Sequence, residues 1–546
     1  MRPVSWSDVL VSAPVLLLCM LVVYWTVLFP FDELRWLGIG DANTEAGPMA
    51  FVMDYSIHQG ELPLWNPLTY CGAPYAANPS RSLFYPPNLL RSLLTLNPTP
   101  YKTHVGLMLL VGAHILFAGV SAFLFARANG LSRPGAFVAT FTFIFASAFL
   151  YRSLGHWRIL FTLSWFPLTL LLLAHALEAR PFTVKARFGI GAGLAAGMAS
   201  LVGAPQAFTT FGFTLGAYYV VHRLIHPRPT LRQCLFGDAI ALGLFGLTTA
   251  LLAFVAVWPT LEFAAFSARG AAADKAALFV RPPERPPWNL LQLLATYSGS
   301  AMDSGIRFAG VGATLLAVAA LFHARKHKVL LYTAMVYVTL DCALGPPFPC
   351  ASLLIRLAPF TMSHPQRAVV FVCFFLGVLS GFGVDALATR PSTRRMAVLR
   401  SAVLLLSGGI LLGTLWGCAR PHPFLDVSWL VLALPAILGA AALAATWLPM
   451  RTAWLAGAVC LVVGEIVVWN IHYIPYFFHG NRAAQPGDIA YLKKQRTFWA
   501  DNGRGTDPNP NWLLYDLEPA MNGYDPLHIE RVHQVICARS MEDEQR

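Results

Sequence analysis

Charged residues are scarce in this chain. They make up 12% of its 546 residues, whereas 56% are hydrophobic, and soluble globular proteins usually carry about a quarter of charged residues. This scarcity excludes an ordinary soluble protein. Cysteines are scattered, and Cys19, Cys373 and Cys460 lie inside apolar segments without any paired spacing. Neither a disulfide framework nor a zinc site is therefore indicated.

Long apolar segments are abundant instead. A helix needs roughly 17 to 25 apolar residues to cross a bilayer, and about thirteen segments of the sequence approach that length. We therefore predict an all-α polytopic membrane protein. The predicted spans are centred on residues 9–31, 104–126, 134–151, 159–177, 188–203, 206–221, 238–259, 308–323, 329–343, 368–388, 401–418, 428–447 and 453–470.

Arginines and lysines gather in alternate connections, which predicts the orientation because positive charge stays inside. With the N-terminus inside, residues 32–103 form a large first extracytoplasmic loop, and residues 260–307 and 344–367 also lie outside. Residues 1–470 are expected to form the transmembrane domain and 471–546 a short extracytoplasmic tail. The net charge of +12 then reflects topology and contact with membrane lipids, and nucleic acid is not an expected partner.

Acidic residues crowd directly after the first predicted span. A carboxylate at this surface can act as a general base if it reaches an attacking hydroxyl; alternatively, such acids only solvate an external loop. Asp41 in "IGDAN" is the strongest candidate, because glycine lets the backbone turn and a helix suited to lie on the membrane is predicted to follow. Asp41 could equally be an ordinary helix N-cap. Glu45 and Asp54 are weaker candidates.

No spacing typical of metal ligands accompanies these acids, so we predict no metal and no other cofactor, although acidic clusters can bind a divalent cation. Cationic side chains are also expected on the outer face, where an arginine fork can bind phosphate through two hydrogen bonds. The alternative is that each one anchors a helix at the interface. The candidates for a phosphate site are Arg152, His156, Arg158, Arg269, His364 and Arg367.

The stretch "GELPLWNPLTYCGAPYAANPSRSLFYPPN", residues 60–88, is too rich in proline to be a helix. Irregular backbone cannot face lipid, so we expect this loop to line a cavity at the outer surface. Its aromatic rings could stack on sugars or form a membrane-interface belt, and for Tyr85 both readings are equally open. The predicted cavity residues are Trp65, Asn66, Tyr70, Tyr75, Arg81 and Tyr85, together with Gln206 of "GAPQ".

In this order, these motifs resemble the YfhO-type family of bacterial membrane proteins, which belongs to the GT-C superfamily of glycosyltransferases. Further matching stretches are "GHWR", "WFPLTLL", "GAPQ", "WPTLEFAAFSARG" and "MNGYDPLHIERV". The chain departs from the family at His364, where an arginine is expected. It also departs in its tail, because family members usually continue into a larger outer domain, and this predicts a shortened outer domain here.

The resemblance implies a glycosyltransferase of the bacterial cytoplasmic membrane. Its donor would be a sugar linked to polyprenyl phosphate, and its acceptor a polymer, lipid or protein of the cell envelope. Carried over from the family, the acid of the first outer loop is Asp41 as general base, with Glu45 and Asp54 as substitutes. Two alternatives remain: a transporter or lipid flippase, for which Glu465 would be the main intramembrane acid, and a non-catalytic truncated family member.

Overall fold

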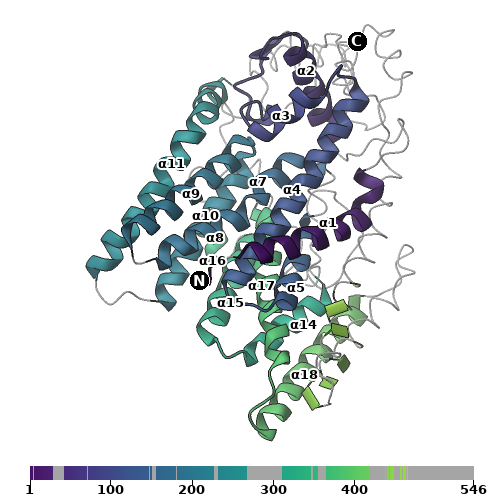
Figure 1. Cartoon of the computed structure of the whole chain (residues 1–546), viewed down its shortest axis with the longest axis vertical. Coiled ribbons are helices and arrows are strands. Elements are labelled where there is room, and N and C mark those ends of the chain that lie inside the picture. Colours follow the sequence, from purple (N-terminus) through teal and green to yellow (C-terminus); the bar gives the residue numbers. More distant parts are fainter. Residues whose placement is uncertain are drawn as a thin grey trace, which may run out of the picture.

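Figure 1 shows the computed structural model, in which the described part of the chain is helical apart from one two-stranded hairpin. This agrees with the predicted all-α class. The structure describes residues 1–3, 5–28, 42–69, 72–146, 148–149, 155–179, 181–226, 231–266, 310–345, 348–354 and 365–418, with short pieces between 437 and 464.

Five of the described helices are long and apolar enough to cross a membrane. A hydrocarbon core about 30 Å thick requires such lengths at 1.5 Å per residue. The protein is therefore an integral membrane protein. These helical segments are Trp6–Tyr24, Pro100–Ala128, Trp157–Glu178, Phe236–Ala265 and Val369–Ala388.

Each predicted span up to residue 418 contains a helix in its described part. The predicted spans 428–447 and 453–470 fall largely outside the described residues, so the total of about thirteen stays a prediction. The helices are α1 (Trp6–Leu28), α4 (Pro100–Ala128), α5 (Arg133–Ile144), α7 (Trp157–Ser164), α8 (Phe166–Glu178), α9 (Phe182–Leu201), α10 (Pro205–Ile225), α11 (Leu231–Ala265), α14 (Val311–Ala319) with η4 (Ala320–Phe322), α15 (Lys326–Leu344), α16 (Pro349–Leu354), η6 (Pro365–Ala368), α17 (Val369–Ala388) and α18 (Arg394–Cys418).

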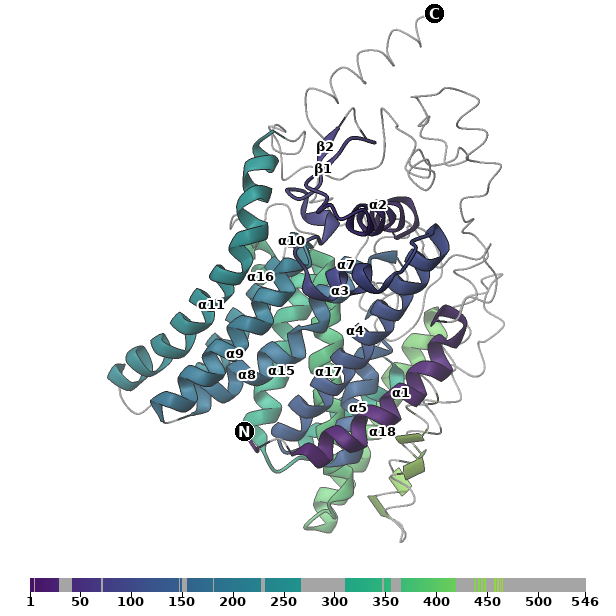
Figure 2. The ribbon, with the colours of Figure 1, turned by 45° about the horizontal axis from the view of Figure 1, so that its top comes forward.

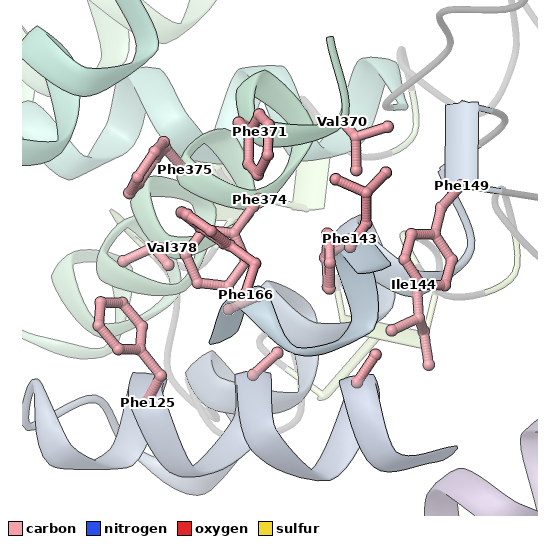
Figure 3. Packing of buried hydrophobic residues seen from close by; sticks show 14 of the residues in the cluster. Phe125, Phe143, Ile144, Phe149, Phe166, Val370, Phe371, Phe374, Phe375 and Val378 are labelled. Atoms are coloured by element: carbon pink, nitrogen blue, oxygen red, sulfur yellow. The ribbon is translucent and has the colours of Figure 1, made fainter. Parts of the chain in front are cut away.

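Helix α17 lies at the centre of the bundle, where 89% of its apolar window is buried. Phenylalanines fill the space around it, as Figure 3 shows. The ring of Phe166 on α8 meets Phe371 and Phe374 of α17 edge-on, with centroids 4.6 and 5.4 Å apart. Edge-to-face contact is a preferred geometry of aromatic pairs. These rings join α8 to α17.

Helices α5 and α17 approach closely at a pair of glycines. A Cβ atom on Gly381 would lie 2.5 Å from the carbonyl oxygen of Gly135, and one on Gly135 would lie 2.8 Å from the carbonyl oxygen of Gly381. Small residues allow backbones to touch in this way inside membranes, where helices associate by packing. The apolar run of α17 is thereby fixed against α5.

A separate layer covers the end of the bundle opposite to the N-terminus (Figure 2). We call it the cap, which comprises residues 42–69 and 72–99. It contains the π-helix η1 (Ala42–Ala46), the helix α2 (Gly47–His58), the hairpin of β1 (Trp65–Asn66) and β2 (Ala73–Pro74), the short helix η2 (Pro79–Arg81), and the helix α3 (Pro86–Leu94). In the hairpin, Trp65 pairs with Pro74 and Asn66 with Ala73 in antiparallel register.

Helix α2 corrects one expectation. The sequence predicted a helix suited to lie on the membrane, but every residue from Gly47 to Asp54 is buried inside the protein. The helix packs against η1, α3 and α4. A carboxylate can be buried in such a helix only if a charged or hydrogen-bonding partner compensates for the loss of water. Asp54 has such partners.

Candidate functional site

Asp54 is the first of two buried acids in the cap, and it is fully enclosed. Its two carboxylate oxygens accept hydrogen bonds from the Arg91 guanidinium of α3 at 2.6 and 2.7 Å, and Oδ2 accepts a further one from Thr103 Oγ1 of α4 at 2.7 Å. Asn88 Oδ1 receives the remaining Arg91 Nε hydrogen bond at 3.0 Å. Bidentate charge-assisted bonds are strong. These contacts favour a structural role for Asp54, which ties α2 to α3 and α4.

Glu45 is the second buried acid and lies in η1, also with no exposed surface. Its Oε1 accepts from Arg81 Nη1 at 2.9 Å and its Oε2 from Arg158 Nη2 at 2.8 Å. Arg158 also donates through Nη1 to the carbonyl oxygen of Ser80 at 2.7 Å. Glu45 therefore links η1 to η2 and to α7, because both of its oxygens are held by guanidinium groups.

The loop that carries Arg81 docks onto the turn before α10. Ser82 Oγ donates to the carbonyl oxygen of Val202 at 2.5 Å. Gly203 has a φ of +81°, and a Cβ atom there would lie 1.8 Å from the carbonyl oxygen of Pro79. Only glycine can adopt this conformation and allow this approach. The glycine of "GAPQ" is thus required by a contact with the irregular loop.

Gln206 and Arg367, which were both predicted as site residues, contact each other. Arg367 Nη1 in η6 donates a hydrogen bond to Gln206 Oε1 at the start of α10. Gln206 follows the turn on which the irregular loop docks, three residues after Gly203. The structure therefore brings two groups of predicted residues to one end of the bundle: the Glu45 cluster, with its two arginines, and the pair of Gln206 with Arg367. His156, also predicted, is the N-cap residue of α7, two positions before Arg158.

The predicted cavity roles of Tyr75 and Tyr85 are wrong. Tyr75 is 1% exposed and donates to the carbonyl oxygen of Met49 at 2.8 Å. Tyr85 has no exposed surface, and its hydroxyl lies 2.5 Å from His114 Nε2 and accepts from Trp165 Nε1 at 2.9 Å. Burial raises the pKa of both phenols above the ordinary tyrosine value. Both rings hold the cap together and offer no face to a ligand.

Asn66 is also buried. Its side chain accepts a hydrogen bond from the Leu68 amide at 3.0 Å and donates one to Thr69 Oγ1 at 3.1 Å, which indicates a structural role. Trp65 differs from the other described aromatic residues predicted in the loop, because 55% of it is exposed. Its ring rests on Gly72, where a Cβ atom would lie 2.7 Å from Trp65 Cζ2. Trp65 therefore remains available for contact with a sugar or the interface.

Several predicted residues fall outside the described part of the chain, and their roles stay predictions: Asp41, Tyr70, Arg152, Arg269 and His364, as well as Glu465. Asp41 directly precedes η1, and π-helical turns are frequent at functional sites. Among the described residues, no group of three or more histidines, cysteines or acids could hold a metal ion.

Arg91 and Thr103, the partners of Asp54, were not predicted. A signal for Arg91 exists, since it follows Asn88 by three positions on α3 and so shares a helix face with it. The contact between Pro79 and Gly203 left no comparable signal. Together, the two buried acids tie the cap to α4 and α7, and they occupy the buried guanidinium groups of Arg81 and Arg91.

No protein-family model and no curated protein matches the sequence. Among solved structures, the chain is similar to ArnT from Cupriavidus metallidurans in the apo state, with 12% identity and a TM-score of 0.52 over 96% of this chain and 88% of that chain. ArnT bound to undecaprenyl phosphate has 13% identity and a TM-score of 0.47 over 98% of this chain and 89% of that chain. Arabinofuranosyltransferase AftD from Mycobacteria has 15% identity and a TM-score of 0.45 over 76% of this chain and 26% of that chain.

At such low identity the likeness shows the fold alone. The chain shares the overall fold of ArnT. Membership of the GT-C superfamily and membership of the YfhO-type family both stay predictions.

Proposed function

We propose that this chain is a glycosyltransferase that moves a sugar from a polyprenyl-phosphate-linked donor to an acceptor of the cell envelope. The observation that carries the proposal is the likeness to ArnT over 96% of the chain. ArnT has also been crystallised with undecaprenyl phosphate bound, which supports a polyprenyl phosphate as the lipid carrier. The acceptor would be a polymer, a lipid or a protein, and the reaction would take place at the cap, on the outer side of the membrane.

Asp41 is our candidate for the general base. Of the three acids considered, Glu45 and Asp54 are fully buried and their oxygens accept hydrogen bonds from arginines. A base must come within hydrogen-bond reach of the hydroxyl that it deprotonates, and these two carboxylates have no exposed surface with which to do so. Asp41 stands one residue before η1, so the Glu45 cluster would anchor the segment that carries it.

In the proposed reaction, Asp41 takes the proton of the acceptor hydroxyl, whose oxygen attacks the anomeric carbon. The bond between that carbon and the phosphate oxygen breaks, and polyprenyl phosphate leaves with the bonding electrons. Arginines stabilise the charge that grows on the phosphate, and Arg158 and Arg367 are the described candidates. Arg152, His156, Arg269 and His364 complete the proposed set, and an apolar groove between helices would hold the prenyl chain. A single displacement inverts the anomeric configuration.

The experiment compares sugar transfer from a polyprenyl-phosphate-linked donor by Asp41→Asn and by Glu61→Gln in proteoliposomes. Glu61 is an exposed acid of the same cap, so its variant controls for loss of one negative charge. Loss of a general base lowers the rate about 10²- to 10⁴-fold, and we expect this for Asp41→Asn at an unchanged melting temperature. Full activity of a folded Asp41→Asn protein would contradict the assignment.

A further inference from the structure

The end of the bundle that carries the N-terminus holds three adjacent cations without a carboxylate partner. Arg325 donates to the carbonyl oxygen of Asn129 at 2.8 Å, and Lys328 Nζ contacts that oxygen at 3.3 Å and Asn129 Oδ1 at 3.2 Å. Lys326 Nζ donates to the carbonyl oxygen of Leu321. All these acceptors are uncharged. Within the described residues, no acid lies at ion-pair distance from any of the three cations.

Three arginines at the same end do have carboxylate partners. Arg127 and Arg133 both reach Asp8 Oδ1, at 3.1 and 3.5 Å. Arg223 makes a bidentate pair with Asp238 at 2.6 and 2.7 Å. Residues 325–328 thus differ from these three arginines, because within the described residues their cationic groups make hydrogen bonds only to uncharged acceptors.

A row of histidine rings leads from the three cations toward α10. The ring of His327 lies 5.1 Å from that of His226, which stacks at 4.8 Å on His222. His222 is 2% exposed, and its Nδ1 has no hydrogen-bond partner among the described residues. A neutral imidazole still donates one N–H hydrogen bond. We call Arg325, Lys326, His327, Lys328 and His226 the basic cluster.

Exposed apolar side chains lie directly beside the basic cluster. Leu330 follows Lys326 by four positions and so shares its face of α15, and it is 58% exposed. Tyr337 continues the same face and is 61% exposed, while Leu224, near the end of α10, is 77% exposed. A ligand that fits both features carries a negative headgroup and an apolar tail.

We propose that the basic cluster binds the phosphate of an anionic phospholipid in the membrane leaflet at this end, with the acyl chains lying along Leu330 and Tyr337. Basic pockets at the ends of membrane helices bind such headgroups, and each lysine or arginine near an anionic surface contributes about 1 kcal/mol. The cluster lies at the opposite end from the cap, so this site is independent of the proposed transferase activity.

The test uses the full-length protein in detergent, titrated with phosphatidylglycerol or with phosphatidylcholine, and follows lipid binding by native mass spectrometry and by the melting temperature. The variant is Lys326→Gln/His327→Gln, in which both changed residues are exposed and folding is expected to be retained. The control is Lys102→Gln. Lys102 is an exposed lysine at the cap end, and within the described part of the chain its ammonium group likewise donates only to carbonyl oxygens, those of Leu96 and Asn97.

We expect phosphatidylglycerol to bind and to raise the melting temperature more than phosphatidylcholine does. The double variant should bind phosphatidylglycerol at least about fivefold more weakly, and Lys102→Gln should bind it like the unaltered protein. Equal binding of the two lipids would overturn the proposal, as would an equal loss in the control. Binding of inorganic phosphate as tight as that of phosphatidylglycerol would also overturn it, because the site would then recognise a soluble anion.

Discussion

Replacing Asp54 by Asn should lower the stability of the cap without changing its folded structure. The substitution keeps the size of the side chain but removes the negative charge that holds Arg91 at 2.6 and 2.7 Å and Thr103 at 2.7 Å. Arg91 is only 6% exposed, so its charge would stay buried without a countercharge. Breaking a buried ion pair from one side costs about 3–5 kcal/mol.

Thermal unfolding of the purified protein measures this loss. We expect Asp54→Asn to lower the melting temperature clearly, while the exposed Glu61→Gln, in the same cap, should leave it nearly unchanged. The double variant Asp54→Leu/Arg91→Met should recover part of the loss, because replacing both partners of an ion pair by apolar residues is often neutral, whereas the Thr103 hydroxyl and Asn88 Oδ1 lose their hydrogen bonds to the pair. The reasoning is refuted if Asp54→Asn melts like the unaltered protein. It is also refuted if Asp54→Asn abolishes sugar transfer at an unchanged melting temperature, since Asp54 would then serve chemistry.

Further substitutions test single contacts by the same melting measurement. Gly203→Ala should destabilise by at least about 1–3 kcal/mol, because alanine is strained at positive φ and its Cβ meets the carbonyl oxygen of Pro79 at 1.8 Å; a neutral result would show that this contact is not made. Tyr85→Phe should cost about 1–3 kcal/mol by leaving the buried His114 Nε2 and the partly buried Trp165 N–H without the phenol oxygen, and retained stability would contradict that network. Gly381→Ala should cost about 1–3 kcal/mol through overpacking of α5 against α17, and should leave the cap contacts unaffected.

The helices of the bundle could be predicted from the sequence, because each apolar run has to satisfy its own backbone inside the membrane and does so locally. The contacts of the cap could not. Glu45 and Arg158 are 113 positions apart, and nothing local indicates that a carboxylate and a guanidinium so distant will meet.

Tyr85 shows why aromatic residues of the loop were misjudged. A tyrosine can stack on a sugar, lie at the membrane interface or form buried hydrogen bonds equally well. Only the contacts of Tyr85 with His114 and Trp165 show which of these roles it has. By contrast, the pairing of Gln206 with Arg367 brings together two residues that were predicted separately for their chemistry.

The central claim is that the protein transfers a sugar and does not merely move a lipid across the membrane. The most direct measurement follows a polyprenyl-phosphate-linked donor with a labelled sugar in proteoliposomes that contain cell-envelope acceptor material. The account predicts that the label becomes covalently attached to the acceptor while free polyprenyl phosphate accumulates in equal amount, and that Asp41→Asn suppresses both. Movement of the intact labelled donor to the opposite leaflet, with no polyprenyl phosphate released, would contradict the account and identify a flippase.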